Sequence, residues 1–461
     1  MKNKSNQQQV EVQLNLIPKK RKEMSSAERV QLYQRKLYQK AKQEKEYRFY
    51  VLYDKIFLTY VVEEAWKRVK ANGGSAGVDG VTIEEIEAKG AEEFLKELSE
   101  ELRQQTYQPS AVKRVWIPKN DGDKRPLGIP TVKDRVAQMA CTLVIEPIFE
   151  ADFEESSYGF RPNRSAQDAV AKIKEHLKTG KTEVYDADLS KYFDTIPHEK
   201  LMIALRERIA DQRVLRLINK WLKAPVYDEG QYKGGKKNKA GTPQGGVISP
   251  LLANLYLHLL DRIVNSVRSI FRKTGVVMVR YADDFVLMGK TLSKAVLSKL
   301  KELLTRMGLT LNEQKSGMIN ARETPFQFLG FVFRYDRNFK IPQSPRFWNV
   351  KPSEKSNKKV RDKVGTALKQ MGHYKPEVLV TELNAIIRGW LNYFEIKGVS
   401  YPYMAKRKLN FYLRMRLVKY FNRKSQRKSR LYRKQAFELL VNKFGLIDPL
   451  RYSPETYCER S

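Results

Sequence analysis

The sequence contains few of the residues that build disulfide frameworks or zinc sites. Its 461 residues include only 2 cysteines, Cys141 and Cys458, and 4 histidines, which are scattered between His176 and His373. A disulfide-stapled fold needs more cysteines, and a structural zinc site needs closely spaced Cys and His ligands. Both classes of protein are therefore excluded.

Long apolar runs are absent as well. No stretch of about 18 apolar residues could form a transmembrane helix, and the Lys- and Gln-rich N-terminus lacks the apolar core of a signal peptide. We therefore expect no membrane segment and a soluble protein in a reducing, intracellular setting.

Acidic residues are too few to balance the basic ones. The chain has 87 Lys and Arg against 52 Asp and Glu, a formal net charge of +35. Residues 1–50 hold 13 basic and 5 acidic residues, and residues 351–461 hold 26 and 9, so the middle of the chain is only mildly basic. An excess of this size attracts polyanions, of which nucleic acid is the commonest.

One segment places two adjacent carboxylates between two strand-like runs. Apolar, β-rich residues flank Ala282-Asp283-Asp284 within residues 276–288 and predict a hairpin with the aspartates at its tip. Aspartate is common in turns, so the pair could simply form the turn. Held close to a sheet, however, the two carboxylates would repel each other unless a cation lay between them.

A second acidic segment follows the predicted strand from Val184 to Leu189. Asp186 and Asp188 alternate with apolar residues and so share one face, with Asp188 at the carboxyl end. Carboxylates from two strands are the ligands that Mg²⁺ needs in order to hold a triphosphate. Together the two acidic segments predict a magnesium site.

Two further segments could contact a phosphorylated ligand. Gln244 precedes the pair Gly245-Gly246 in a loop before a predicted helix, where backbone could approach a ligand closely. An extended segment from Val112 to Pro118 predicts a strand that runs into a turn. Lys119 and Arg125 flank this turn and could clamp phosphates. A plain loop before a core helix and ordinary surface charges would look the same.

These segments together resemble the ordered motifs of the reverse transcriptases encoded by bacterial group II introns. Nine motifs account for the resemblance, and they follow one another in the same order as in the family: Arg48–Asp54, Gly77–Gly80, Arg125–Pro130, Ser157–Pro162, Asp188–Asp194, Pro243–Gly246, Tyr281–Asp284, Leu311–Lys315 and Phe328–Phe331. Beyond them, Lys351–Ser353 and Ile387–Phe394 are similar to the thumb, or maturase domain X, of the same family.

The resemblance implies an α/β (α+β) right-hand polymerase with an antiparallel sheet in its palm, followed by an all-α thumb. The division that we expect is a basic N-terminal extension (1–47), fingers with part of the palm (48–180), palm (181–344) and thumb or domain X (345–461). For the extension, a solvated and disordered leader stays an equal alternative.

The resemblance also implies the metal site. Asp188, Asp283 and Asp284 would be the catalytic residues, and with Leu189 they would hold two Mg²⁺ ions, for which Mn²⁺ could substitute. These ions would serve two-metal nucleotidyl transfer from a dNTP to a DNA primer.

Five residues match the family's nucleotide-binding positions. Lys119 and Arg125 would contact the β- and γ-phosphates, and Gln244 would line the nucleotide pocket. Phe193 would be the aromatic gate that excludes a ribose 2′-hydroxyl, with ordinary packing as the alternative. Lys315 would protonate the departing pyrophosphate, although a surface lysine is equally consistent with its position.

The thumb is expected to grip intron RNA. Five cations interleaved with aromatic residues are the candidate contacts, because RNA binding combines phosphate contacts with stacking: Lys406, Arg407, Lys408, Arg414 and Arg416. The implied partners are group II intron RNA, a DNA primer or target and dNTPs, without a membrane and with a monomer or a homodimer left open.

The expected function is therefore an RNA-directed DNA polymerase and maturase of the bacterial cytoplasm, promoting splicing and retrohoming. Family members often continue into a Cys- and His-rich HNH endonuclease, which we do not expect here. A host-domesticated reverse transcriptase in defence or repair, and an RNA-binding maturase with a relict palm, stay as alternatives.

Overall fold

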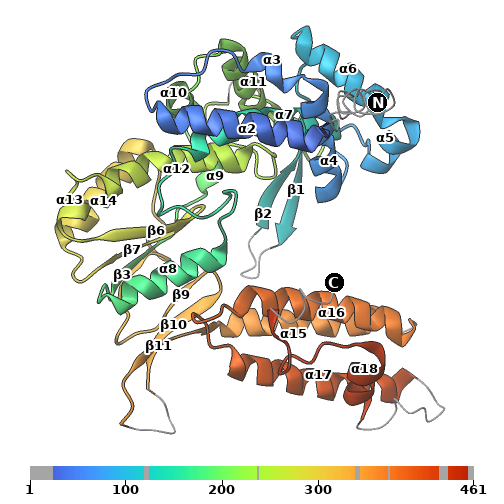
Figure 1. Cartoon of the computed structure of the whole chain (residues 1–461), viewed down its shortest axis with the longest axis vertical. Helices are drawn as coiled ribbons and strands as arrows, with labels where there is room; N and C mark the ends of the chain where they lie inside the picture. Colours follow the sequence, from blue (N-terminus) through green and yellow to red (C-terminus); the bar gives the residue numbers. More distant parts are fainter. Residues whose placement is uncertain are drawn as a thin grey trace, which may run out of the picture. The chain divides into compact units, whose positions relative to one another are not determined.

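The computed structural model describes residues 24–118, 124–235, 238–337, 343–371, 374–424 and 435–454 (Figure 1). The chain forms two compact units. Unit 1 consists of Met1–Phe153 and Phe193–Tyr256, and unit 2 consists of Glu154–Tyr192 and Leu257–Ser461. Each unit is thus built from two separate stretches of chain. The four-part division predicted from the sequence stays a prediction, and Lys119 and Cys458 lie outside the described residues.

Unit 1 is mainly helical. Its helices up to residue 150 are α2 (Ser26–Gln43), α3 (Tyr53–Ile56), α4 (Thr59–Asn72), α5 (Ile83–Lys89), α6 (Ala91–Arg103) and α7 (Val132–Glu150). The second stretch adds α10 (His198–Arg206) and α11 (Gln212–Leu222), while the chain passes from one unit to the other within α9 (Tyr192–Thr195) and within α12 (Ser249–Asn265). Helix α7 is buried on most of its surface, as its nearly continuous apolar sequence predicts.

The basic N-terminal extension is partly a docked helix. Helix α2 begins at a capping box in which Ser25 and Glu28 each bond the other's backbone. Its buried residues include Val30 and Leu37, and Gln34 Nε2 donates to the Leu143 carbonyl in α7 at 2.9 Å. A disordered leader therefore does not describe residues 26–43.

The sheet of unit 1 has the strand order β2-β1-β4-β5. Its strands are β1 (Val112–Pro118), β2 (Lys124–Ile129), β4 (Pro225–Asp228) and β5 (Gln231–Gly234). Strands β1 and β2 pair antiparallel, and β4 joins β1 in parallel. Strand β1 has the bounds that the sequence predicts.

Unit 2 contains an antiparallel sheet of order β6-β7-β3-β8. The strands are β3 (Glu183–Ala187), β6 (Val277–Tyr281), β7 (Asp284–Gly289) and β8 (Gly317–Asn320). Helices α8 (Ala166–Lys178), α13 (Ile270–Lys273) and α14 (Lys294–Met307) belong to the same unit. The central strand β7 is apolar on both faces after Asp284, and these residues are buried.

A second sheet and four helices complete unit 2. The sheet has the order β11-β10-β9 and consists of β9 (Phe326–Phe328), β10 (Phe331–Asp336) and β11 (Phe347–Pro352). The helices are α15 (Glu354–Gln370), α16 (Pro376–Phe394), α17 (Tyr403–Lys424) and α18 (Ala436–Phe444). One hydrophobic core runs from Val184 and Val286 in the first sheet to Leu383 and Leu413 in these helices.

The structure confirms the predicted fold class, a mixed α/β chain with antiparallel sheet and a helical C-terminal region. It corrects the prediction that the chain is helical from residue 345: residues 347–352 form strand β11, because each of them finds a partner on β10. Among the described residues, no helix combines the length and apolar character that crossing a membrane requires.

Candidate active site

The predicted carboxylate hairpin is present in unit 2. Strands β6 and β7 pair from Val277 with Met288 to Tyr281 with Asp284, which leaves Ala282 and Asp283 as a two-residue turn. Ala282 has a φ of 56°, a left-handed backbone conformation that is uncommon for a residue with a Cβ. The turn therefore depends on support from its surroundings.

The sheet register brings the second acidic segment to the same edge. Strand β3 pairs antiparallel with β7, with Ala187 opposite Phe285 and Asp186 opposite Val286. The carboxyl end of β3 therefore lies beside the start of β7. Asp188, one residue beyond β3, and the turn residue Asp283 come from neighbouring strands of one sheet, as predicted.

Two residues that the sequence did not identify hold Asp188. Asn312 Nδ2 donates to Asp188 Oδ2 at 3.1 Å, and the Asn312 N–H donates to the Asp188 carbonyl at 2.8 Å. The Asp188 N–H in turn donates to Ser316 Oγ at 3.1 Å. Both residues belong to the segment that also contains Lys315, and an amide three residues before this predicted nucleotide-binding lysine was the available signal.

Electrostatics links the acidic residues to one another. Desolvation, followed by the charges of Asp283, Asp188 and Asp186, raises the pKa of Asp284 to about 7, while Lys315 acts to lower it. Desolvation and then Asp188 raise the pKa of Asp186 to about 6. Water reaches the exposed Asp284 side chain and screens part of this repulsion. Burial and the neighbouring carboxylates therefore disfavour the ionised forms of Asp284 and Asp186.

The donor set suits a hard divalent cation. Among the described residues, no group of three or more His, Cys, Asp or Glu side chains is already close enough to hold an ion. The carboxylates that help to raise the pKa of Asp284 and of Asp186 are nevertheless oxygen donors of the kind that Mg²⁺ binds, and a cation would relieve their repulsion. Leu189 is buried, and its backbone bridges to Leu311.

In unit 1, the predicted nucleotide-contacting residues meet at one loop. Arg125 Nε donates to Gln244 Oε1 at 2.8 Å, and the Gly128 N–H donates to the Gln244 carbonyl at 2.5 Å. A Cβ on Gly245 would lie 2.3 Å from the Gly128 carbonyl oxygen, so only glycine allows this approach. Phe193 is buried, and its carbonyl accepts the Thr242 N–H at 2.7 Å, which ties it to the same loop.

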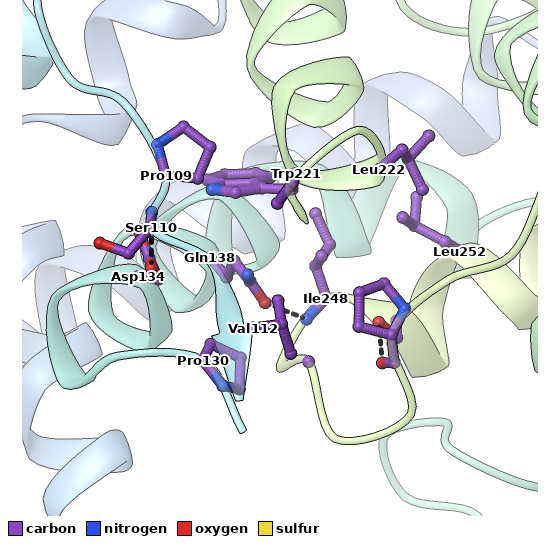
Figure 2. Close-up of a pocket in the computed structure, with 14 residues that line it drawn as sticks. Pro109, Ser110, Val112, Pro130, Asp134, Gln138, Trp221, Leu222, Ile248 and Leu252 are labelled. Carbon is purple, nitrogen blue, oxygen red and sulfur yellow. Dashed lines mark hydrogen bonds between the residues drawn. The ribbon is translucent and has the colours of Figure 1, made fainter. Parts of the chain in front are cut away.

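A small pocket lies behind this loop (Figure 2). Figure 2 shows Gln138 of α7 directed toward Ile248, whose N–H it accepts on Oε1 at 3.4 Å. Trp221 and Leu252 contribute apolar walls, and Asp134 accepts the Ser110 N–H at 3.1 Å. Gln138 therefore supports the loop that carries Gln244, a role that the sequence did not reveal.

The predicted RNA-binding cations of α17 differ in their surroundings. Lys406 is buried, and its Nζ donates to both Glu395 oxygens at 3.0 Å and to the Tyr452 carbonyl at 2.9 Å. Its ammonium group is thus hydrogen-bonded within unit 2, and we do not retain Lys406 as an RNA contact. Lys408 is exposed and pairs with Glu354 at 2.9 Å.

Arg414 and Arg416 are half-buried. Arg414 pairs with Glu438 and lies over the Phe437 ring at 4.3 Å, and Arg416 lies over the Tyr412 ring at 5.8 Å. Both guanidiniums therefore have intramolecular neighbours, and their contact with RNA stays a prediction.

One face of α17 is exposed and carries a residue that the sequence did not single out. Phe411 is 66% exposed, with Met404 and Met415 at 60% and 58%. These positions and the exposed Arg407 are spaced i, i+3, i+7 and i+11, which places them along one side of the helix. We call Met404, Arg407, Phe411 and Met415 the open face of α17.

Two family models match the chain. Residues 117–333 match the reverse transcriptase (RNA-dependent DNA polymerase) family, and residues 357–437 match the group II intron, maturase-specific domain. The first match includes the four aspartates at the edge of the β6-β7-β3-β8 sheet, and the second covers most of α15 and all of α16 and α17.

Three individual proteins are also similar to this chain in sequence. Protein YkfC of Escherichia coli K12 is 38% identical over 292 residues, covering 56% of this chain and 74% of that protein. The group II intron-encoded protein LtrA of Lactococcus lactis is 31% identical, covering 61% of this chain and 56% of LtrA. An uncharacterised 91 kDa protein in the cob intron of Schizosaccharomyces pombe is 28% identical, covering 72% of this chain and 49% of that protein.

The chain spans about half the length of the latter two proteins. From the two family matches and the extent of the likeness, the chain belongs to the reverse transcriptases, or RNA-dependent DNA polymerases, that carry a group II intron maturase-specific domain.

Proposed function

We propose that this protein copies RNA into DNA by adding dNTPs to a primer 3′-hydroxyl. The observation that carries the proposal is the gathering of four aspartates at one edge of the β6-β7-β3-β8 sheet, where desolvation and the neighbouring carboxylates raise the pKa of Asp284 and of Asp186. Such a group of carboxylate oxygens suits metal-assisted phosphoryl transfer. The matched reverse transcriptase family supports this reaction class over hydrolysis.

The acidic residues would hold the metal ions. Asp188 and Asp283 are the principal ligands in this proposal, Asp284 supports them, and the Leu189 carbonyl completes the set. Mg²⁺ bound there would lower the pKa of the primer hydroxyl and neutralise the triphosphate. Asn312 keeps the Asp188 carboxylate oriented through its bond to Oδ2.

The nucleotide would be bound by the residues around the Gln244 loop. Arg125, with Lys119, would contact the β- and γ-phosphates, since guanidinium and ammonium groups suit phosphate oxygens. Its existing bond to Gln244 Oε1 orients the Arg125 guanidinium before a ligand arrives. Phe193 would exclude the 2′-hydroxyl, and Lys315 would protonate pyrophosphate.

Primer extension tests the polymerase. The wild-type protein should extend oligo(dT) on poly(rA) with dTTP and Mg²⁺, and the double variant Asp283→Asn, Asp284→Asn should not. Asp362→Asn, at an exposed position on α15, is the matched control and should extend normally. Extension by the double variant would show that the metal assignment is wrong.

We further propose that the protein binds group II intron RNA as a maturase, which promotes splicing and retrohoming. The matched maturase-specific domain and the net positive charge of residues 351–461 support this role. On the open face of α17, Phe411 would stack on a base and Arg407 would contact phosphate. A DNA target and the bacterial cytoplasm, the setting that the bacterial relatives favour, complete the proposal.

RNA binding tests the maturase role separately. Group II intron RNA should copurify with the protein and be identifiable by sequencing. Phe411→Ala should weaken binding of that RNA by about 1–3 kcal/mol, the contribution of one stacked base. Val378→Ala, which removes another exposed apolar side chain on α16, is the control. Equal affinity in both variants would exclude Phe411 from the interface.

A further inference from the structure

A buried ion pair lies directly behind the catalytic turn. Arg280, the last-but-one residue of β6, and Asp261 of α12 both have 0% exposed side chains. Arg280 Nε donates to Asp261 Oδ1 at 2.9 Å and Nη2 donates to Oδ2 at 2.5 Å, a bidentate pairing. Such a pair loses its hydration on folding, so apolar residues of similar volume would often serve stability as well or better. Its presence calls for a reason other than stability.

The guanidinium has a third contact, and it leads to the turn. Arg280 Nη1 donates to the Ala282 carbonyl at 2.9 Å. Ala282 is the left-handed residue of the turn, and its carbonyl belongs to the peptide that joins it to Asp283. The bond therefore fixes the orientation of the peptide on which the Asp283 side chain depends.

The same turn is supported from another side. The Arg280 N–H donates to the Ser156 carbonyl at 2.8 Å, and the Tyr158 N–H donates to the Arg280 carbonyl at 2.9 Å. These bonds bring Gly159 against the turn, where a Cβ would lie only 2.4 Å from the Ala282 nitrogen. Segment 156–159 and the Arg280 guanidinium thus hold Ala282 between them.

We propose that Arg280 and Asp261 are positioning residues that hold the Ala282-Asp283 turn in its metal-binding conformation. Asp261 fixes one edge of the guanidinium, and Nη1 constrains the Ala282 carbonyl. This inference rests on the proposed polymerase function and deepens it by naming residues that act through Asp283 without touching the substrate. In this proposal the ion pair restricts the turn to one backbone conformation.

The decisive variant replaces both charges at once. Asp261→Leu with Arg280→Met removes the ion pair without leaving a buried charge, so the fold should keep its stability. It also removes the bond to the Ala282 carbonyl. In primer extension on poly(rA)/oligo(dT), we expect kcat to fall roughly 10- to 100-fold and half-saturation by Mg²⁺ to shift to higher concentration. The KM for the template and the affinity for intron RNA should not change.

Two further variants keep the test informative if the double variant does not fold. Arg280→Lys retains the charge but cannot reach both partners in the same geometry, and Gly159→Ala displaces Ala282 while leaving the ion pair intact. Both should reproduce the loss of kcat and the Mg²⁺ shift. The matched control is Arg208→Lys in unit 1, which alters a buried arginine bonded to Asp152 and to the carbonyls of residues 41, 44 and 45.

The outcomes separate the two proposals. If the wild-type protein does not extend a primer, the polymerase function itself fails. If the wild type extends and the folded Arg280 and Gly159 variants keep kcat within about twofold and the same Mg²⁺ dependence as Arg208→Lys, the positioning role is overturned.

Discussion

The aspartates at the edge of the β6-β7-β3-β8 sheet (Asp186, Asp188, Asp283 and Asp284) should lower the stability of unit 2 when no metal is bound. The substitution Asp284→Asn should relieve this effect. The pKa of Asp284 is about 7 in the folded protein against 3.8 for an unperturbed aspartate. The folded state therefore retains a proton that the unfolded state has lost between these two values. The contribution of Asp284 to the free energy of unfolding is therefore highest at low pH. It falls as the pH rises from about 4 to 7 and stays at its minimum above 7.

The size of the effect follows from the shift and from the exposure of the side chain. About three pKa units would correspond to about 4 kcal/mol at 1.36 kcal/mol per unit. Because the Asp284 side chain is exposed, solvent screening should reduce this to about 1 kcal/mol. For a cooperative unit of 150–250 residues, that free energy changes the melting temperature by about 2–4 °C.

Differential scanning calorimetry of wild type and Asp284→Asn in EDTA measures this difference. At pH 8 the variant should melt about 2–4 °C above the wild type, and at pH 5 the gap should shrink. Adding Mg²⁺ at pH 8 should raise the wild-type melting temperature more than that of the variant, since a cation replaces the missing proton. A variant that is less stable than the wild type at pH 8 in EDTA would refute the reasoning.

Three further substitutions test other parts of the site. Asn312→Ala should lower kcat roughly 10-fold by releasing Asp188, measured by primer extension, and an unchanged kcat would contradict this. Gln138→Leu removes a hydrogen bond worth about 1 kcal/mol behind the nucleotide loop and should raise the KM for dTTP roughly fivefold at nearly constant kcat; a loss in kcat alone would point elsewhere. Lys406→Met should cost about 2 kcal/mol of unfolding free energy with unchanged affinity for intron RNA, seen by thermal melting beside filter binding, and weakened RNA binding at full stability would restore Lys406 to the interface.

The sequence predicted those parts of the site that depend on local pattern. Alternating apolar residues around Ala282-Asp283 identify a hairpin, because period-two burial and turn chemistry both act over a few residues. The same holds for strand β1, whose predicted bounds match the structure. The order of the motifs then allowed a family assignment that geometry alone would not have reached.

Contacts between distant residues could not be predicted in this way. Asn312 and Asp188 are 124 residues apart, and no periodic pattern reports that pairing. The charges of α17 were equally ambiguous, since a basic helix does not indicate which lysine faces the interior. Lys406 is buried because Glu395 and a backbone carbonyl satisfy it, and both partners come from other segments.

The strand order of unit 2 has a consequence for how the protein is made. Strand β3 is synthesised first but lies between β7 and β8, which follow it by about a hundred residues or more. During translation, the edge of β3 that pairs with β7 therefore stays without its partner until the chain has passed residue 289, and the edge that pairs with β8 until it has passed residue 320. Pairings of such sequence separation form slowly, and an open apolar strand can pair with another chain in the meantime. Expression conditions that slow synthesis between residues 190 and 320 should therefore decide how much of this enzyme reaches its folded state.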